Sequence, residues 1–220
     1  MVKVSGINLK LIDSLKSINS KILKAIAGKL NKAVSSSKTS ILSDLKTQAS
    51  EWLNDEQVIR DLRGTGSLNA EIGLPAGHAA GAADLIVNAI VESLDINFKQ
   101  FNDKMAGGMS IGIQPSDFQN VLNIGKATIV TSKGQELNWL EWLLKSGNRI
   151  IIRDYSIEYG RYAKRSRSGQ DAIMVKRKSG GWKMPTQYAG VEENNFITRA
   201  FEGRESEISK IISKHVKSKI

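Results

Sequence analysis

The stretch from residue 136 to residue 160 constrains the fold most, because its periodicity changes from helical to extended midway. WLEWLLK at 139–145 predicts a short helix with a wide apolar face, which ends at Gly147 because glycine commonly follows the last helical residue. III at 150–152 predicts a strand buried on both faces, and the alternation at 154–159 predicts a strand with one apolar face. The expected core residues are Trp139, Trp142, Ile151, Tyr155, Trp182, Phe196 and Phe201.

The N-terminal segment, residues 1–53, predicts two amphipathic helices. Apolar residues recur at steps of three and four along 7–34, which is the spacing of one helical stripe. Three serines at 35–37 predict a break or a bend, and a second helix follows at 39–52. Because little nearby sequence can bury this stripe, we expect it to pack on a later sheet or on a neighbouring subunit. A membrane surface is the alternative, although the stripe has no aromatic residue before Trp52.

The remainder, residues 54–220, predicts an α+β body. The glycine-rich run RGTGSLNAEIGLPAG predicts a loop, HAAGAADLIVNAIVES at 78–93 predicts a helix, and two alternating runs at 94–101 and 109–113 predict an antiparallel hairpin. A closing helix is expected over 194–216, capped by Asn194 or Asn195. The fold class is therefore α+β, with long N-terminal helices, a central antiparallel sheet and a C-terminal closing helix.

The net charge of +10 is concentrated in two parts of the chain. Residues 1–48 hold nine lysines against two aspartates, and residues 161–183 hold eight basic residues against one aspartate. Residues 49–160 hold fourteen acidic and nine basic residues. This segregation indicates contact with an anionic partner, either nucleic acid or an acidic protein face, although solvated surface lysines also explain residues 1–48.

Residues 161–183 predict a basic arm that protrudes as a hairpin. AIMV at 172–175 is a short apolar strand inside it, and an aromatic side chain lies among the basic ones, a combination that suits phosphate contact and stacking. An arm of this charge could equally enter an acidic groove on another subunit. The expected partner or DNA contacts are Arg161, Tyr162, Lys164, Arg165, Arg167, Lys176, Arg177 and Lys178.

Motifs for catalysis, cofactors and metals are missing from the sequence. There is no cysteine, which excludes disulfides, thiolate metal sites and a cysteine nucleophile. Gly125-Lys126 lacks the spacing of a phosphate loop, and His78 suits a structural role at a helix start. Glu141, Asp154 and Glu158 suit amphipathic faces better than a catalytic pair. We expect no enzyme activity, cofactor or metal site, and neither a membrane span nor a signal peptide.

The C-terminal third resembles the tail-completion or neck proteins of tailed bacteriophages, which join the head portal to the tail. The resemblance rests on EYG at 158–160, GGWKMPTQYAG at 180–190 and NNFITRAFEGRESEI at 194–208. Asn195, Phe196, Arg199 and Ala200 match the start of that family's closing helix. The likeness is loose over most of the chain and firmer over 136–208. The second N-terminal helix and the small-residue helix at 78–93 are additions, which leave open which layer of the neck this chain would form.

The resemblance implies a virion protein at the head–tail junction, assembled in the host cytoplasm. It implies a homo-oligomeric ring of roughly six or twelve subunits, with portal, connector and tail proteins as partners and packaged DNA as a further contact. The alternative is a non-virion nucleic-acid-binding protein that uses the basic arm at 161–183.

Overall fold

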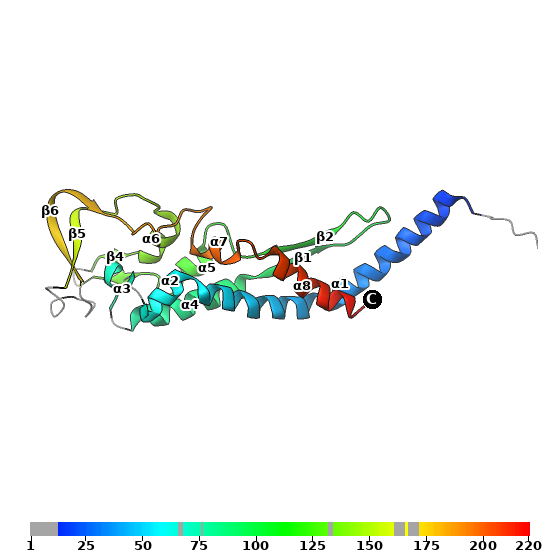
Figure 1. Ribbon diagram of the computed structural model, residues 1–220, viewed down its shortest axis with the longest axis horizontal. Helices are drawn as coiled ribbons and strands as arrows, with labels where there is room; N and C mark the ends of the chain where they lie inside the picture. The colour runs from blue at the N-terminus through cyan, green and yellow to red at the C-terminus, as the bar shows by residue number, and fades with distance from the viewer. Residues whose placement is uncertain (1–12, 66–67, 76, 132–133, 161–165, 167–171) are drawn as a thin grey trace, which may run out of the picture.

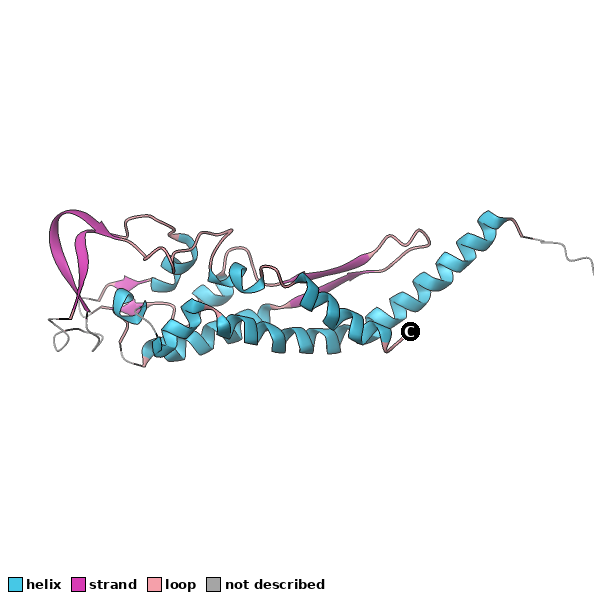
Figure 2. Ribbon diagram, viewed as in Figure 1, coloured by secondary structure: helices cyan, strands magenta, loops and turns pink. Residues whose placement is uncertain are grey.

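The computed structural model describes residues 13–65, 68–75, 77–131, 134–160, 166 and 172–220. The molecule is elongated, with one long helix along one side and shorter helices beside it, and its strands form three two-stranded antiparallel ribbons, one of which lies beyond the end of the long helix (Figures 1 and 2). The α+β class, with a long N-terminal helix, antiparallel strands and a C-terminal helix, is confirmed. The strands form three separate ribbons, so no single sheet occupies the centre of the described chain.

Helix α1, Leu15–Asp55, is one continuous helix. Two helices separated by a break or a bend at residues 35–37 were expected; the break is wrong, because these serines stay helical and one helix spans the segment. The Ser36 hydroxyl donates to Ala33 O at 3.0 Å, and the buried Ser37 hydroxyl donates to His215 O at 3.1 Å. A bond to the preceding turn, such as that of Ser36, satisfies serine inside a helix and tends to bend it. Figure 1 shows the N-terminal part of α1 running away from the body at an angle.

The next elements are short helices that turn the chain back along α1. They are α2 (Gln57–Arg60), a π-helical turn η1 (Asp61–Thr65), α3 (Leu68–Ile72) and α4 (His78–Ser93). Helix α4 confirms the expected helix over the same residues. Helix α3 corrects the expected loop, because Leu68 and Ile72 are buried and their packing supports a helix in a glycine-rich sequence.

The first ribbon pairs β1 (Asp95–Lys99) with β2 (Gly108–Gly112), which confirms the expected hairpin. Asn31 of α1 ties its end to the long helix: the side-chain amide donates to Phe101 O at 2.9 Å and accepts from Phe101 N at 2.8 Å. The chain continues through α5 (Gln119–Leu122), β3 (Ile129–Val130), β4 (Glu136–Leu137) and α6 (Trp139–Lys145). Gly147, with φ of +52°, follows α6 as expected.

The last ribbon pairs β5 (Ile152–Tyr159) with β6 (Ala172–Trp182), and the chain closes with α7 (Phe196–Phe201) and α8 (Glu205–Lys217). One closing helix over 194–216 was expected, and this is wrong. Gly203 takes φ of +73° between α7 and α8, a conformation that favours glycine and ends a helix.

The core lies where the C-terminal half of α1 meets α2–α4, α6 and α7. Trp139, Trp182 and Phe196 are buried there as expected, and Trp142, Ile151 and Phe201 are half-buried against it. Tyr155 is 36% exposed and is not a core residue. The strand expected to be buried on both faces at 150–152 is also wrong, because Ile150 is 53% exposed and β5 begins only at Ile152.

Candidate functional site

The β5–β6 ribbon lies at one end of the molecule, where it curves back over α3 and α6 (Figure 1). The strands pair from Ile152↔Trp182 to Tyr159↔Ala172, and the register shifts between Arg153 and Tyr155. Asp154 takes φ of +59° at this shift and Gly180 takes φ of +94° on the facing strand. Because a bulge increases local twist, this irregularity accounts for the curvature of the ribbon. The strand expected within the basic arm is present as β6, and it pairs with β5, which precedes the arm; residues 161–165 and 167–171 of the arm lie outside the described residues. The basic residues 176–178 lie beside the bulge.

Three of the expected contact residues are placed by the structure, and all three are exposed on β6. Arg177 is held on the ribbon surface: its Nε donates to Ser156 Oγ at 2.6 Å, and its guanidinium pairs with Glu158 Oε1 at 2.8 Å. Lys176 and Lys178 have no ion-pair partner among the described residues, so their charges remain available for an external anion. The other expected contacts, Arg161, Tyr162, Lys164, Arg165 and Arg167, lie outside the described residues.

Glu71 of α3 anchors the ribbon to the body. One carboxylate oxygen accepts from the Tyr159 hydroxyl, and the other accepts from Trp182 Nε1 at 3.1 Å. Burial, and then the adjacent Glu71 carboxylate, raise the pKa of Tyr159 above its ordinary value, so the phenol stays a donor. No local sequence pattern points to Glu71, because its two partners are 88 and 111 residues away.

An apolar cavity of about 370 Å³ lies beneath the ribbon. Trp142 and Trp182 meet edge to face there, with ring centroids 5.5 Å apart. The other lining side chains are mostly apolar, and Glu71 is already hydrogen-bonded to the wall of the cavity. Among the described lining residues Glu71 is the one titratable side chain, so these residues supply no paired acid and base.

Of the acidic and histidine side chains considered from the sequence, Glu158 and His78 have polar partners in the structure. Glu158 pairs with Arg177, and Asp154 is exposed at the bulge. His78 Nε2 lies 3.1 Å from Lys126 O, which also accepts from Trp139 Nε1 at 2.9 Å. No group of three or more His, Asp or Glu side chains within the described ranges could hold a metal ion.

The N-terminal part of α1 forms a second exposed surface, at the opposite end of the molecule from the ribbon (Figure 1). Leu15 is 74% exposed, and Ile22 and Ile26 also lie in solvent. These side chains continue the stripe whose packing on a sheet or a neighbour was expected from the sequence. Further along α1, Ala27, Ala33 and Val34 are buried, and Ile41 and Leu45 meet Ile96 of β1.

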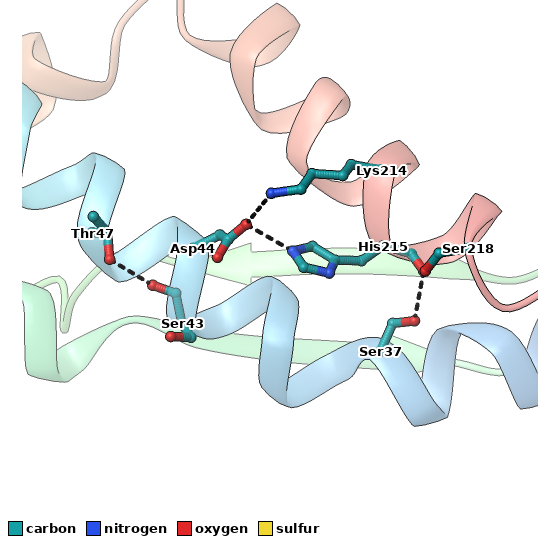
Figure 3. A network of polar contacts seen from close by, with 7 residues as sticks. All are labelled: Ser37, Ser43, Asp44, Thr47, Lys214, His215 and Ser218. Atoms are coloured by element: carbon teal, nitrogen blue, oxygen red, sulfur yellow. Dashed lines mark hydrogen bonds and ion pairs between the residues drawn. The ribbon is translucent and has the colours of Figure 1, made fainter.

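Helix α8 is fastened to α1 by a polar network (Figure 3). Asp44 Oδ2 accepts from His215 Nε2 at 2.8 Å and from Lys214 Nζ at 3.1 Å. These two hydrogen bonds, His215 first, hold the pKa of Asp44 below its ordinary value. Below the network, Ile208, Ile211 and Ile212 of α8 pack on Ile41, Leu45 and Ile96. Apolar packing and this network together hold α8, which has no fully buried residue, against α1.

Comparison of the chain with known protein families, curated proteins and solved structures gives no match. None of the helices in the described part has both the length and the apolar character that a membrane crossing needs.

Proposed function

We propose that this protein is a structural subunit of a tailed-bacteriophage virion, which forms an oligomeric ring at the head–tail junction and connects the portal to the tail. The observation that carries the proposal is the exposed apolar stripe of α1, at the far end of the molecule from the exposed lysines of β6. Large exposed apolar surface marks a protein contact. A subunit with an interaction surface at each end can join neighbours without performing chemistry.

The C-terminal block adds support, because the residues that carry the resemblance have structural roles here. Asn195 caps α7 with a capping box, and Phe196 and Ala200 are buried in the core. Arg199 donates to Asn194 Oδ1 at 3.1 Å. In this function the body positions the two surfaces: α1 contacts adjacent subunits, and the β5–β6 ribbon contacts the portal, the tail or packaged DNA.

Mass spectrometry of purified phage particles tests the proposal. We expect the chain in mature virions at a ratio to the portal protein that fits a ring. Loss of the gene should yield filled heads and free tails that fail to join, visible by electron microscopy. Absence of the chain from particles, or normal joining without it, would reject this function.

Nucleic-acid binding outside a virion is the second candidate, and the exposure of Lys176 and Lys178 favours it. It predicts salt-dependent binding of a DNA duplex by the purified protein, because each lysine that neutralises a phosphate releases counterions. Lys176→Gln and Lys178→Gln should each reduce the slope of log K against log salt by about 1. Lys99→Gln, at an exposed lysine on β1, is the matched control. A mobility-shift assay that shows no binding near physiological salt rejects the second candidate.

A further inference from the structure

Tyr155 of β5 carries an aromatic ring that the fold does not use. The side chain is 36% exposed. Among the residues that the structure describes, no second ring packs on it, no cation lies over it, and its hydroxyl has no hydrogen-bond partner. The nearby Tyr159, by contrast, donates its hydroxyl to Glu71. A single exposed ring is ordinary on a protein surface, so the side chains around Tyr155 decide what it can bind.

The side chains around Tyr155 include cations that have no ion-pair partner. Lys176 lies directly opposite Tyr155 in the ladder, so both side chains share one face of the ribbon. Arg153 precedes the ring on β5, and Lys178 lies two residues beyond Lys176 on β6. All three cations are exposed, and none of them makes an ion pair within the described part of the chain. The ribbon bows outward beyond the helices, where an extended ligand can reach it (Figure 2).

The carboxylates of the ribbon and its anchor do not neutralise these cations. Residues 149–160 and 172–183 contain six basic and two acidic residues. Of the two acidic residues, Glu158 is paired with Arg177, and Asp154 is exposed at the bulge. Glu71 of α3 already accepts hydrogen bonds from the ribbon. The ribbon therefore keeps an excess of positive charge, and the ligand that complements it is negatively charged.

The free ring favours an unpaired nucleotide strand over other polyanions. In such a strand the phosphates pair with the cations, and an unstacked base covers the ring. The carboxylates of an acidic protein would satisfy the cations but would contribute nothing to the face of Tyr155. A duplex keeps its bases stacked on one another, so the ring gains no base there.

We propose that the β5–β6 ribbon binds single-stranded nucleic acid, with a base stacked on Tyr155 and the backbone phosphates beside Arg153, Lys176 and Lys178. The inference rests on the nucleic-acid candidate of the proposed function. It names the ligand as an unpaired strand and adds Tyr155 as a contact residue. DNA and RNA strands share the base and the phosphate, so both are tested.

Fluorescence anisotropy of the full-length protein with a labelled oligothymidylate of about 20 nucleotides tests the stacking. The matched ligand is an abasic strand with the same phosphates and no bases. Tyr155→Leu removes the ring and keeps an apolar side chain. We expect this variant to bind the thymidylate strand roughly 5- to 100-fold more weakly, the value of one stacked base, and to bind the abasic strand as the parent does. Tyr155→Phe should retain binding, and so should Ile150→Ala, the control at another exposed apolar residue.

Salt dependence separates the role of the cations from that of the ring. Lys176→Gln should lower the slope of log K against log salt by about 0.7 for both strands, because the lysine contacts phosphate. Tyr155→Leu should leave this slope unchanged. Oligouridylate replaces oligothymidylate in a second arm. Weaker binding of Tyr155→Leu to either strand supports the stacking and identifies the sugar that the ribbon accepts.

Two results overturn the proposal: Tyr155→Leu, shown to be folded by circular dichroism, binds the thymidylate strand like the parent, or it loses affinity equally for the abasic strand. Competition by polyglutamate as strong as that by oligothymidylate also overturns it. Duplex binding together with an unchanged thymidylate affinity of Tyr155→Leu retains the nucleic-acid candidate and rejects only the stacking. Absence of binding to any of these nucleic acids rejects both.

Discussion

Asn195 stabilises the start of α7 through every hydrogen-bonding group of its side chain. Its Oδ1 accepts from Ile197 N at 3.0 Å and from Thr198 N at 3.3 Å, while its Nδ2 donates to Val191 O and Glu192 O. The side chain is fully buried, so water cannot replace these bonds. Replacement by alanine would leave several backbone groups without partners.

We expect Asn195→Ala to lower the free energy of unfolding by about 1–3 kcal/mol, from loss of the cap and of buried hydrogen bonds. Urea denaturation followed by circular dichroism measures the change. Asn194→Ala is the matched control, because Asn194 is exposed and its side chain bonds only Arg199 among the described residues. Equal effects of the two substitutions would contradict the role of Asn195.

The two tryptophans of α6 differ in burial, so we expect different costs of truncation. Trp139 is fully buried and donates to Lys126 O, whereas Trp142 is half-buried against Trp182. Trp139→Ala should cost about 3–5 kcal/mol, and Trp142→Ala a smaller amount, about 1–3 kcal/mol. Thermal melting of the two variants compares them. A larger loss of stability for Trp142→Ala than for Trp139→Ala would contradict the assignment of Trp139 to the centre of the core.

Asp44 makes the docking of α8 sensitive to acid. Its pKa is lowered by hydrogen bonds from His215 and Lys214, so the folded protein keeps the carboxylate ionised at a lower pH than the unfolded chain does. The resulting stability is fully present above the unfolded pKa of about 3.9, and it is lost as the pH falls through the lower folded value.

We therefore expect the difference in melting temperature between the wild-type protein and Asp44→Asn to be largest near neutral pH and to shrink below about pH 4. Calorimetry across this range measures it. Asp55→Asn is the control, because Asp55 is exposed and lacks an ion pair within the described residues. A difference that stays constant down to about pH 2 would exclude the Asp44 contacts as its source.

At the scale of elements, the periodicity within a segment predicted the helices and strands whose buried face can be read from that segment alone. Helix α4, helix α6 and the β1–β2 hairpin follow from their own sequences, and the AIMV run correctly marks the start of β6. Distant partners explain what was missed. Ser37 stays helical because α8 returns to accept its hydroxyl. Helix α3 forms where Leu68 and Ile72 meet the core, although its flanking glycines favour a loop.

The candidate site was predicted in part, for the same reason. Composition located the basic residues of β6, because charge is a property of the sequence. It could not show that Arg177 is engaged by Glu158 and Ser156 while Lys176 and Lys178 are left available, since that difference arises from strand register. Likewise, the isoleucines at 150–152 suggested a buried strand. However, β5 begins only at Ile152, and Ile150 lies before it in solvent.

At the scale of the whole molecule, α1 connects both candidate surfaces. Its C-terminal half packs in the core that supports the β5–β6 ribbon, and its N-terminal part carries the apolar stripe. Asn31 marks where the β1–β2 hairpin is tied to the helix, so residues nearer the N-terminus project beyond that support. In the proposed function, the direction of this stripe relative to the body sets where a neighbouring subunit binds.

Because α1 is continuous across residues 35–37, the direction of the stripe depends on the number of helical residues between the stripe and the body. Each residue advances the helix by about 100° and 1.5 Å. One alanine inserted between Lys24 and Ala25, both exposed, would rotate Leu15, Ile18 and Ile22 by about 100° relative to the body. Seven inserted residues would move these side chains about 10 Å outward and return their direction to within about 20°.

In the proposed function, the single insertion should weaken the contact between subunits, and a seven-residue insertion should recover the direction of the stripe but shift its target along the partner. Analytical ultracentrifugation measures the assembly, and intact far-ultraviolet circular dichroism would show that both variants remain helical. Equal assembly of the parent and the one-residue variant would mean that the direction of the stripe does not matter. In such a helix, each added residue changes both the distance and the direction of the stripe. Insertions that alter subunit spacing during evolution should therefore come close to whole numbers of helical turns.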